Sequence, residues 1–210
     1  MKKAFLVVDL QNDFLPGGAL GVKEGDEVVP LINQLVKQPF SLVVASKDWH
    51  PEQHGSFADT HQKEVGEYTK LRGMDQILWP VHCVQGTPGA EFSDTLDHEH
   101  FDKVFHKGTD EDIDSYSAFF DNGHLKATGM GDYLKDNGIT DLYIAGLTTD
   151  YCVKYSVLDA IALGFRTHVV RDACKPVNLS PDDEEKAIEE MKKAGAQVTT
   201  VQQVVEEFNG

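Results

Sequence analysis

Short apolar segments alternate with segments of helical periodicity along the whole chain, and this alternation limits the possible folds more than any other feature. Six β-rich segments are expected, at Ala4–Asp9, Ser41–Ser46, Lys103–His106, Asp141–Gly146, Arg166–Arg171 and Gln197–Val201. Several of them are continuous apolar runs, as expected of strands that are covered on both faces. The alternation therefore predicts an α/β fold, in which an open parallel sheet carries helices on both faces.

Three segments between these strands repeat apolar residues at helical spacing. They are marked by Val28, Leu31, Ile32, Leu35 and Val36, by Val153, Val157, Ala160 and Ile161 before Gly164, and by Ala187, Ile188 and Met191. The stretch from Trp49 to about Glu99 is irregular and rich in His, Gly and Pro. It is too long for a plain connection, and long ordered loops in compact domains tend to carry function.

The size and charge of the chain narrow its class and its partners. The 210 residues suit a single domain spanning residues 1–210, since no repeat or linker divides them. A formal net charge of −16 repels phosphate backbones and anionic lipid, so nucleic acid and membranes are not expected partners. The sequence leaves open whether the chain forms a homo-oligomer.

The first residues resemble the start of an export signal only superficially. Lys2 and Lys3 precede the apolar run Ala4–Val8, but Asp9 ends that run. A signal peptide needs an apolar core of roughly 7–15 residues, and a membrane helix needs about 20. We therefore interpret the run as a buried first strand and predict a cytoplasmic protein.

Chemically useful side chains follow four of the predicted strands. Asp9 ends the first strand, Asp48 and His50 follow the second, Lys107 follows the third, and Cys152 lies just after the fourth. In open parallel sheets, ligands bind beyond the carboxyl ends of the strands. We expect these residues to converge at one edge of the sheet.

Cys152 is the predicted nucleophile. The chain has three cysteines, Cys83, Cys152 and Cys174, and their odd number without CxxC spacing argues against a disulfide framework or a zinc finger. Thr149 or Asp150 is expected to cap the next helix, which places the thiol in the first turn. The unpaired N–H groups and the helix dipole favour a thiolate there.

The residues predicted to surround Cys152 complete a catalytic group. Lys107 would lower the thiol pKa further, and Asp9 would accept the thiol proton and later deliver it to leaving ammonia. Backbone N–H groups of the same turn could form an oxyanion hole. The simpler alternative is that Cys152 is a buried packing residue, which is our interpretation of Cys83 and Cys174.

Two clusters in the irregular stretch suggest a metal site. Asp48-Trp49-His50 and Trp79-Pro80-Val81-His82 offer one carboxylate and two imidazoles, a common set of ligands for an open metal site. His54 is a candidate fourth ligand. Each histidine alone is more often an ordinary surface or core residue. Phe14 and Trp79 are candidates to sandwich a flat ring.

Taken together, these motifs resemble a known family. The matching segments are Val8–Phe14 (VDLQNDF), Asp48–Pro51 (DWHP) with His54 and Ser56–Phe57, Trp79–Cys83 (WPVHC), Lys107–Thr109 (KGT), Asp114–Phe119 (DSYSAF) and Gly146–Cys152 (GLTTDYC). They resemble the nicotinamidases, also called pyrazinamidases, of the isochorismatase-like hydrolase superfamily. The similarity covers almost the whole chain.

The resemblance implies both a fold and a site. The fold would be a three-layer, doubly wound α/β/α arrangement around a six-stranded parallel sheet. The catalytic residues would be Asp9, Lys107 and Cys152, with the N–H groups of Thr148 and Cys152 as oxyanion hole and a cis peptide between Leu147 and Thr148. The pocket residues would be Phe14, Trp79 and Tyr116. One divalent metal ion, zinc before iron or manganese, would be held by Asp48, His50 and His82, with His54 joining in some relatives.

The resemblance also implies an activity. The chain would convert nicotinamide to nicotinate and ammonia in NAD salvage, with pyrazinamide as a further substrate. Isochorismatases share the fold but lack a cysteine nucleophile, and carbamoylsarcosine-type amidases lack the metal cluster. A binding protein without turnover is a rival from another class, but it would have no need for an aligned nucleophile and base.

Overall fold

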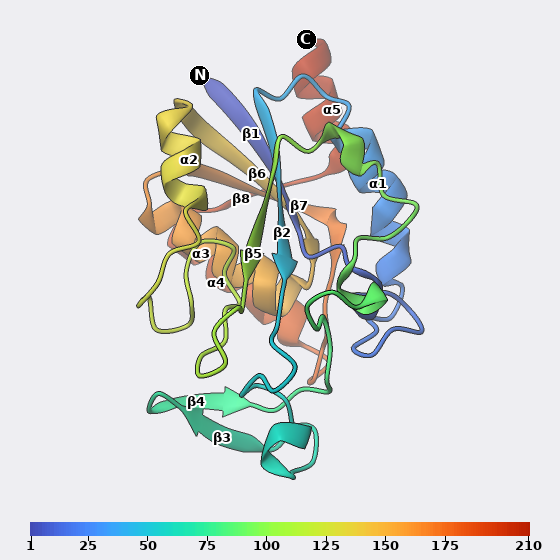
Figure 1. Cartoon of the computed structure of the whole chain (residues 1–210). Coiled ribbons are helices and arrows are strands. Elements are labelled where there is room, and N and C mark those ends of the chain that lie inside the picture. Colours follow the sequence, from blue (N-terminus) through green and yellow to red (C-terminus); the bar gives the residue numbers. More distant parts are fainter.

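Six parallel strands form the centre of the molecule in the computed structural model, which describes residues 1–210 (Figure 1). They are β1 (Lys2–Val8), β2 (Leu42–Asp48), β5 (Lys103–Lys107), β6 (Ile139–Leu147), β7 (Arg166–Lys175) and β8 (Gln197–Thr199). Their order across the sheet is β5-β2-β1-β6-β7-β8, and every neighbouring pair is parallel. The predicted six-stranded parallel sheet is confirmed.

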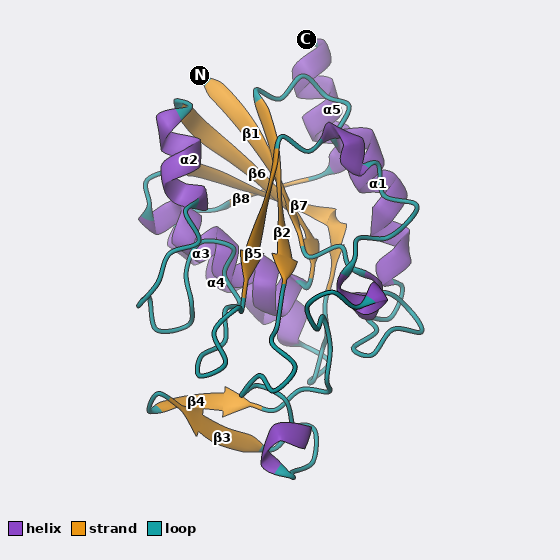
Figure 2. Ribbon diagram, viewed as in Figure 1, coloured by secondary structure: helices purple, strands orange, loops and turns teal.

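Helices cover both faces of this sheet, as the strand–helix alternation predicted. The helices are α1 (Val28–Leu35), α2 (Met130–Asp136), α3 (Lys154–Ala162), α4 (Asp183–Ala194) and α5 (Val201–Asn209). Figure 2 shows α1 and α5 on one side of the strands and α2, α3 and α4 on the other. The fold is therefore the predicted three-layer, doubly wound arrangement. No helix is both long enough and apolar enough to span a membrane.

The first strand is the clearest case of sequence deciding structure. Ala4–Val8 is completely buried, because β1 has paired neighbours on both edges and helices over both faces. Strand order reverses between β1 and β6, and such a reversal opens a crevice at the carboxyl ends of the two strands. The side chains discussed below lie at this crevice.

Gly146 allows β6 to approach β1 closely at that crevice. Its φ is +129°, and a Cβ atom at this position would lie 2.2 Å from the carbonyl oxygen of Val8. Any side chain at position 146 would collide with the backbone of β1, so the end of β6 requires glycine there.

Several parts of the chain differ from the prediction. The strand expected at Gln197–Val201 ends at Thr199, since Thr200 caps α5 in a capping box with Gln203. The irregular stretch from Trp49 to Glu99 contains an antiparallel hairpin formed by β3 (Tyr68–Leu71) and β4 (Met74–Ile77), which lies apart from the central sheet (Figure 1). Helices α2 and α5 were not predicted either.

Candidate active site

The carboxyl ends of four strands supply the charged core of the candidate site. Asp9 follows β1, Asp48 ends β2, Lys107 ends β5, and Cys152 lies in a short π-helical segment, Thr149–Val153, after β6. Asp48 and Lys107 are register partners across β2 and β5. The structure brings these four residues together, as the strand-end argument predicted.

Lys107 lies at the centre of this group. Its Nζ atom is 2.8 Å from Asp9 Oδ2, 2.5 Å from Asp48 Oδ1 and 3.4 Å from Cys152 Sγ, and it donates a hydrogen bond of 2.9 Å to the carbonyl oxygen of Ser115. Lys107 is only 2% exposed, and Asp9 is completely buried. One ammonium group, buried away from solvent, thus contacts two carboxylates and a thiol.

The two carboxylates differ in their electrostatic environment. Burial raises the pKa of Asp9, although Lys107 acts in the opposite direction. Burial also acts to raise the pKa of Asp48, but Lys107 and His50 outweigh it and hold that pKa well below its usual range. Asp48 is therefore the fixed anion of the pair, and Asp9 is the carboxyl group that can more readily take up a proton.

The thiol does not follow the expected pattern. Burial raises the pKa of Cys152 well above its usual value, and Lys107 offsets this only in part. The prediction that the turn favours a thiolate is wrong for the free site, because desolvation outweighs the nearby cation. The thiol therefore needs a base, and Asp9 lies close by, with its carboxylate oxygen within 4.8 Å of Cys152 Sγ.

The predicted cap of the following helix is also wrong. Thr148 is the residue before the π-helical segment, and it makes no capping bond through its side chain. Thr149 Oγ1 instead donates to Glu184, and the Asp150 carboxylate accepts the backbone N–H groups of Val177 and Asn178. These two side chains thus bind residues of other segments instead of capping the helix that follows the turn. The peptide bond between Leu147 and Thr148 is cis, as the resemblance implied.

A second cluster of buried polar side chains adjoins the first. Asp48 Oδ2 lies 3.5 Å from His50 Nε2 and 3.6 Å from His82 Nε2. The Nδ1 atoms of the two rings contact backbone carbonyl oxygens, those of Gly108 at 2.8 Å and Pro80 at 2.7 Å. Both Nε2 atoms therefore face the carboxylate.

This cluster fits a metal ion. The buried Nε2 atom of His50 has no hydrogen-bond partner, and the three ligand atoms lie within 4.8 Å of one another. A metal-binding histidine commonly donates its second ring N–H to a carbonyl, which is the arrangement at His50 and His82. Two imidazoles and one carboxylate suit a divalent transition-metal ion with open coordination positions.

His54 lies beside this cluster, but both of its ring nitrogens have partners. Nδ1 is 2.7 Å from Ser56 Oγ, and Nε2 is 3.2 Å from the carbonyl oxygen of Ile113. Burial lowers the pKa of His54 to about 4, so the ring is neutral at pH 7. His54 groups with His50 and Asp114 instead of with Asp48 and His82.

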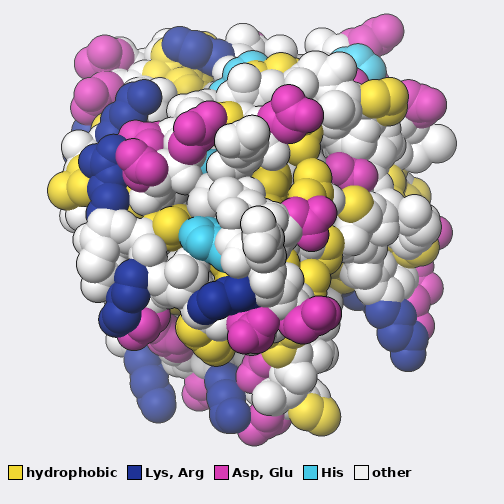
Figure 3. Space-filling model, turned by 60° about the horizontal axis from the view of Figure 1, so that its bottom comes forward, with side chains coloured by type: hydrophobic (Ala, Val, Ile, Leu, Met, Phe, Trp, Pro, Cys, Tyr) yellow, Lys and Arg dark blue, Asp and Glu magenta, His cyan; other side chains and the backbone are white.

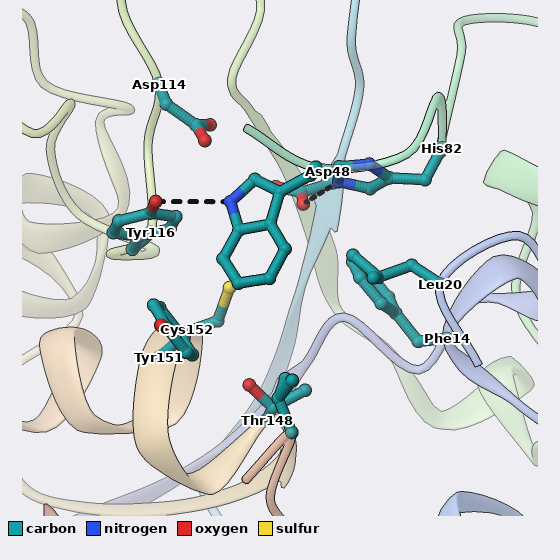
Figure 4. Close-up of a pocket in the computed structure, with 11 residues that line it drawn as sticks. Phe14, Leu20, Asp48, His82, Asp114, Tyr116, Thr148, Tyr151 and Cys152 are labelled. Atoms are coloured by element: carbon teal, nitrogen blue, oxygen red, sulfur yellow. Dashed lines mark hydrogen bonds and ion pairs between the residues drawn. The ribbon is translucent and has the colours of Figure 1, made fainter. Parts of the chain in front are cut away.

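A narrow pocket joins the thiol to the histidine cluster (Figure 4). It is lined by Phe14, Leu20, Asp48, Trp79, His82, Asp114, Tyr116, Thr148, Tyr151, Cys152 and Val177. Trp79 Nε1 donates to the Tyr116 hydroxyl at 3.3 Å, and the Trp79 and Tyr151 rings meet edge to face. Apolar and aromatic walls with polar groups at the two ends suit a small flat ring that carries a polar substituent.

The outer surface at this end of the molecule is mixed in character. Figure 3 shows hydrophobic side chains between acidic and basic ones on the end that carries the carboxyl ends of the strands.

Three predicted residues line the pocket: Phe14 and Trp79, which their residue types suggest, and Tyr116, which the family resemblance implies. Leu20, Asp114, Tyr151 and Val177 also line the pocket and were not predicted. Asp114 could have been found, because it begins the motif Asp114–Phe119 that also contains Tyr116.

The chain is similar to known proteins both in sequence and in overall fold. Residues 3–203 match the family profile described as the Isochorismatase domain. The chain is 47% identical to a nicotinamidase of Escherichia coli (strain K12) over 95% of each chain. It superposes on a nicotinamidase/pyrazinamidase of Acinetobacter baumanii with a TM-score of 0.93 and 42% identity, covering 97% of this chain and 98% of that one. A pyrazinamidase of Pyrococcus horikoshii in complex with zinc gives a TM-score of 0.78 and 38% identity, covering 95% and 99%.

Proposed function

Since this chain belongs to the isochorismatase family, we propose that it hydrolyses nicotinamide to nicotinate and ammonia, with Cys152 as nucleophile. It is an amidohydrolase that acts on a carbon–nitrogen bond. The observation that supports the assignment of residues most strongly is the position of Lys107 Nζ, 2.8 Å from Asp9 and 3.4 Å from Cys152 at the end of an aromatic pocket. A nucleophile, a base and a cation meet where the carboxamide of a bound ring would lie.

The first half of the reaction forms a thioester. Asp9 takes the proton of the Cys152 thiol, and the sulfur attacks the carboxamide carbon of the substrate. The backbone N–H groups of Thr148 and Cys152 stabilise the negative charge that develops on the carboxamide oxygen. Protonated Asp9 then gives its proton to the departing nitrogen, so the carbon–nitrogen bond breaks and ammonia leaves.

The second half releases the acid. Asp9 takes a proton from a water molecule, which attacks the thioester carbon, and the carbon–sulfur bond breaks to give nicotinate. The proton returns to the Cys152 sulfur. Lys107 remains protonated throughout, because the carboxylates of Asp48 and Asp9 outweigh burial and hold its pKa well above the usual lysine value. Its charge stabilises the thiolate and keeps Asp9 oriented.

Asp48, His50 and His82 would hold a divalent metal ion, with zinc as the proposed ion and iron or manganese as alternatives. When bound, the ion would supply a Lewis-acidic contact that orients the heteroaromatic nitrogen of the substrate. His54 joins this set only if its ring releases Ser56 or Ile113. Phe14, Trp79 and Tyr116 hold the ring of the substrate.

Pyrazinamide, which differs from nicotinamide by one ring nitrogen, is a further proposed substrate. We place the reaction in NAD salvage, because the hydrolysis releases nicotinate, which is a precursor of NAD. Growth of a strain that depends on nicotinamide deamidation, with and without this chain, would test that placement.

The decisive experiment measures ammonia and nicotinate release by the purified protein and by its Cys152→Ala variant. The variant should lose turnover by at least about 10⁴-fold, as other cysteine and serine hydrolases do without their nucleophile, while its metal content stays unchanged. Turnover of the variant at more than a trace level would exclude Cys152 as nucleophile. A benzene carboxamide, which lacks a ring nitrogen, serves as the control substrate and should react much more slowly.

A further inference from the structure

The hairpin of β3 and β4 buries one polar side chain, that of Gln76, and the apolar Leu71 is its only other buried residue. Gln76 is only 3% exposed, whereas its strand neighbour Asp75 is exposed. Burial of a primary amide is unfavourable unless hydrogen bonds compensate for the lost water. The partners of Gln76 therefore indicate why the hairpin turns this residue inward.

Those partners belong to the pocket. Gln76 Nε2 lies 3.1 Å from the Tyr116 hydroxyl and 3.4 Å from Asp114 Oδ2, and it also donates to the carbonyl oxygen of Ile77 at 2.8 Å. Tyr116 and Asp114 both line the cavity that ends at Cys152 (Figure 4). A side chain outside the pocket thus contacts two pocket residues at once.

The Tyr116 hydroxyl receives two N–H donors. One comes from Gln76 and the other from the Trp79 indole at 3.3 Å. A phenol oxygen has two lone pairs, so both are engaged and the phenol ring and indole are held in one mutual arrangement. Without the Gln76 amide, the buried Tyr116 oxygen would lose one partner, and the wall formed by Trp79 and Tyr116 would gain freedom.

We infer that Gln76 is a positioning residue for substrate binding, which acts through Tyr116 and Trp79 and makes the β3–β4 hairpin part of the substrate site. The inference rests on the proposed function, since it concerns the affinity of the pocket for nicotinamide. Gln76 contacts no reacting atom, so its loss should weaken ring binding and leave the chemical step nearly unchanged.

The test compares Gln76→Leu, which keeps the size of the side chain but removes the donors, with Asp75→Asn on the exposed side of the same strand. Gln76→Leu should raise the KM for nicotinamide about tenfold, the factor expected for one lost buried hydrogen bond, with kcat changed by less than about twofold. Asp75→Asn should leave both constants unchanged. Equal KM values for the wild type and Gln76→Leu would overturn the inference, as would a loss confined to kcat.

A double-mutant cycle tests whether Gln76 acts through Tyr116. Tyr116→Phe removes the acceptor, so adding Gln76→Leu to that variant should raise KM by less than about twofold more. A full tenfold further rise would show that Gln76 does not act through the hydroxyl. These readings require an active wild type; a wild type that releases no ammonia would instead refute the proposed function.

Gln76→Glu decides the question if Gln76→Leu does not fold. It preserves shape but replaces the donor by an acceptor that faces Asp114. Its KM should rise by at least about tenfold at pH 7.5, because the lost donor is joined by repulsion between like charges. An unchanged KM for this variant would also overturn the inference. Calorimetric binding of nicotinamide in the Cys152→Ala background should show the same weakening without turnover.

Discussion

At the scale of single residues, one buried ammonium group sets the charge state of the candidate site. Lys107 contacts Asp9, Asp48 and Cys152 together. The pKa of Asp48 is held low and that of Asp9 is raised, so chemically identical groups acquire different roles from their surroundings. The proposed base is the carboxyl group with the raised pKa, as proton transfer to it requires.

Gly108 is the residue that makes room for the His50 ring. A Cβ atom at Gly108 would lie 2.4 Å from His50 Cε1 and 2.7 Å from its Nδ1, and its φ is +64°. The Gly108 carbonyl oxygen also accepts the hydrogen bond from His50 Nδ1. This glycine therefore fixes both the place and the orientation of a proposed metal ligand.

We predict that Gly108→Ala weakens metal binding by about 10- to 100-fold, the usual effect of disturbing the groups that orient a ligand. Metal content after dialysis against a chelator series measures this. Gly66→Ala is the matched control, because Gly66 has a similar φ of +91° but no atom within 4 Å of the added Cβ. Equal metal content in the two variants would contradict the role of Gly108.

At the scale of elements, the turn that carries Cys152, the proposed nucleophile, is tied to the segment after β7. The Asp150 carboxylate accepts the N–H groups of Val177 at 2.9 Å and Asn178 at 2.8 Å, and Asp150 is only 5% exposed. Val177 lines the pocket beside Cys152. The Asp150 side chain thus couples the turn that carries Cys152 to a part of the pocket wall that comes from a distant segment of the sequence.

Asp150→Ala should destabilise the protein by about 1–3 kcal/mol, because two partly buried N–H groups lose a charged acceptor. It should also raise the KM for nicotinamide, since Val177 is no longer held. Urea unfolding and steady-state kinetics measure the two effects. Asp182→Ala, which removes an exposed carboxylate paired with Lys186, should change neither by a measurable amount. A stability of Asp150→Ala equal to that of this control would refute the coupling.

Element boundaries show where local sequence signals competed. The apolar pattern of Gln197–Val201 indicated a longer strand, but the Thr200 and Gln203 pair forms a capping box that starts α5 instead. That signal was present in the sequence. The β3–β4 hairpin had a weaker signal, because its strands have four residues each and are largely exposed, so neither shows a clear two-residue alternation.

At the scale of the whole molecule, the end of the sheet opposite the site has its own polar network. The His168 ring stacks on Tyr143 with centroids 4.2 Å apart, and the Tyr143 hydroxyl donates to Glu207 on α5. Burial lowers the pKa of His168 below its ordinary value of 6.5, although Asp141 acts in the opposite direction. The buried ring therefore resists protonation in the folded state.

The direction of that shift predicts how stability depends on pH. The unfolded chain binds a proton at His168 below pH 6.5, whereas the folded protein binds it only at lower pH, so this histidine reduces stability as the pH falls below 6.5. Between pH 7.5 and 5.5 the wild type should lose more thermal stability than His168→Gln. Melting temperatures at both values test this, with the exposed His100→Gln as control. A decrease in the melting temperature of His168→Gln as large as that of the wild type would refute this prediction.

The sequence by itself determined the fold class and the residues that meet at the site. Buried strands such as Ala4–Val8 require cover on both faces, and parallel strands end on one edge, so Asp9, Asp48, Lys107 and Cys152 could be brought together from the strand pattern alone. These inferences need only the local periodicity of the sequence and the rule that parallel strands have their carboxyl ends at one edge of the sheet.

Tertiary structure alone decided the charge states and the supporting contacts. The thiol pKa depends on desolvation, which arises only when distant segments close over Cys152. The same holds for Gln76, which donates to Tyr116 forty positions away, and for Asp150, which binds N–H groups of Val177 and Asn178. Burial and long-range hydrogen bonding are properties of the packed chain, and no local pattern of residues encodes them.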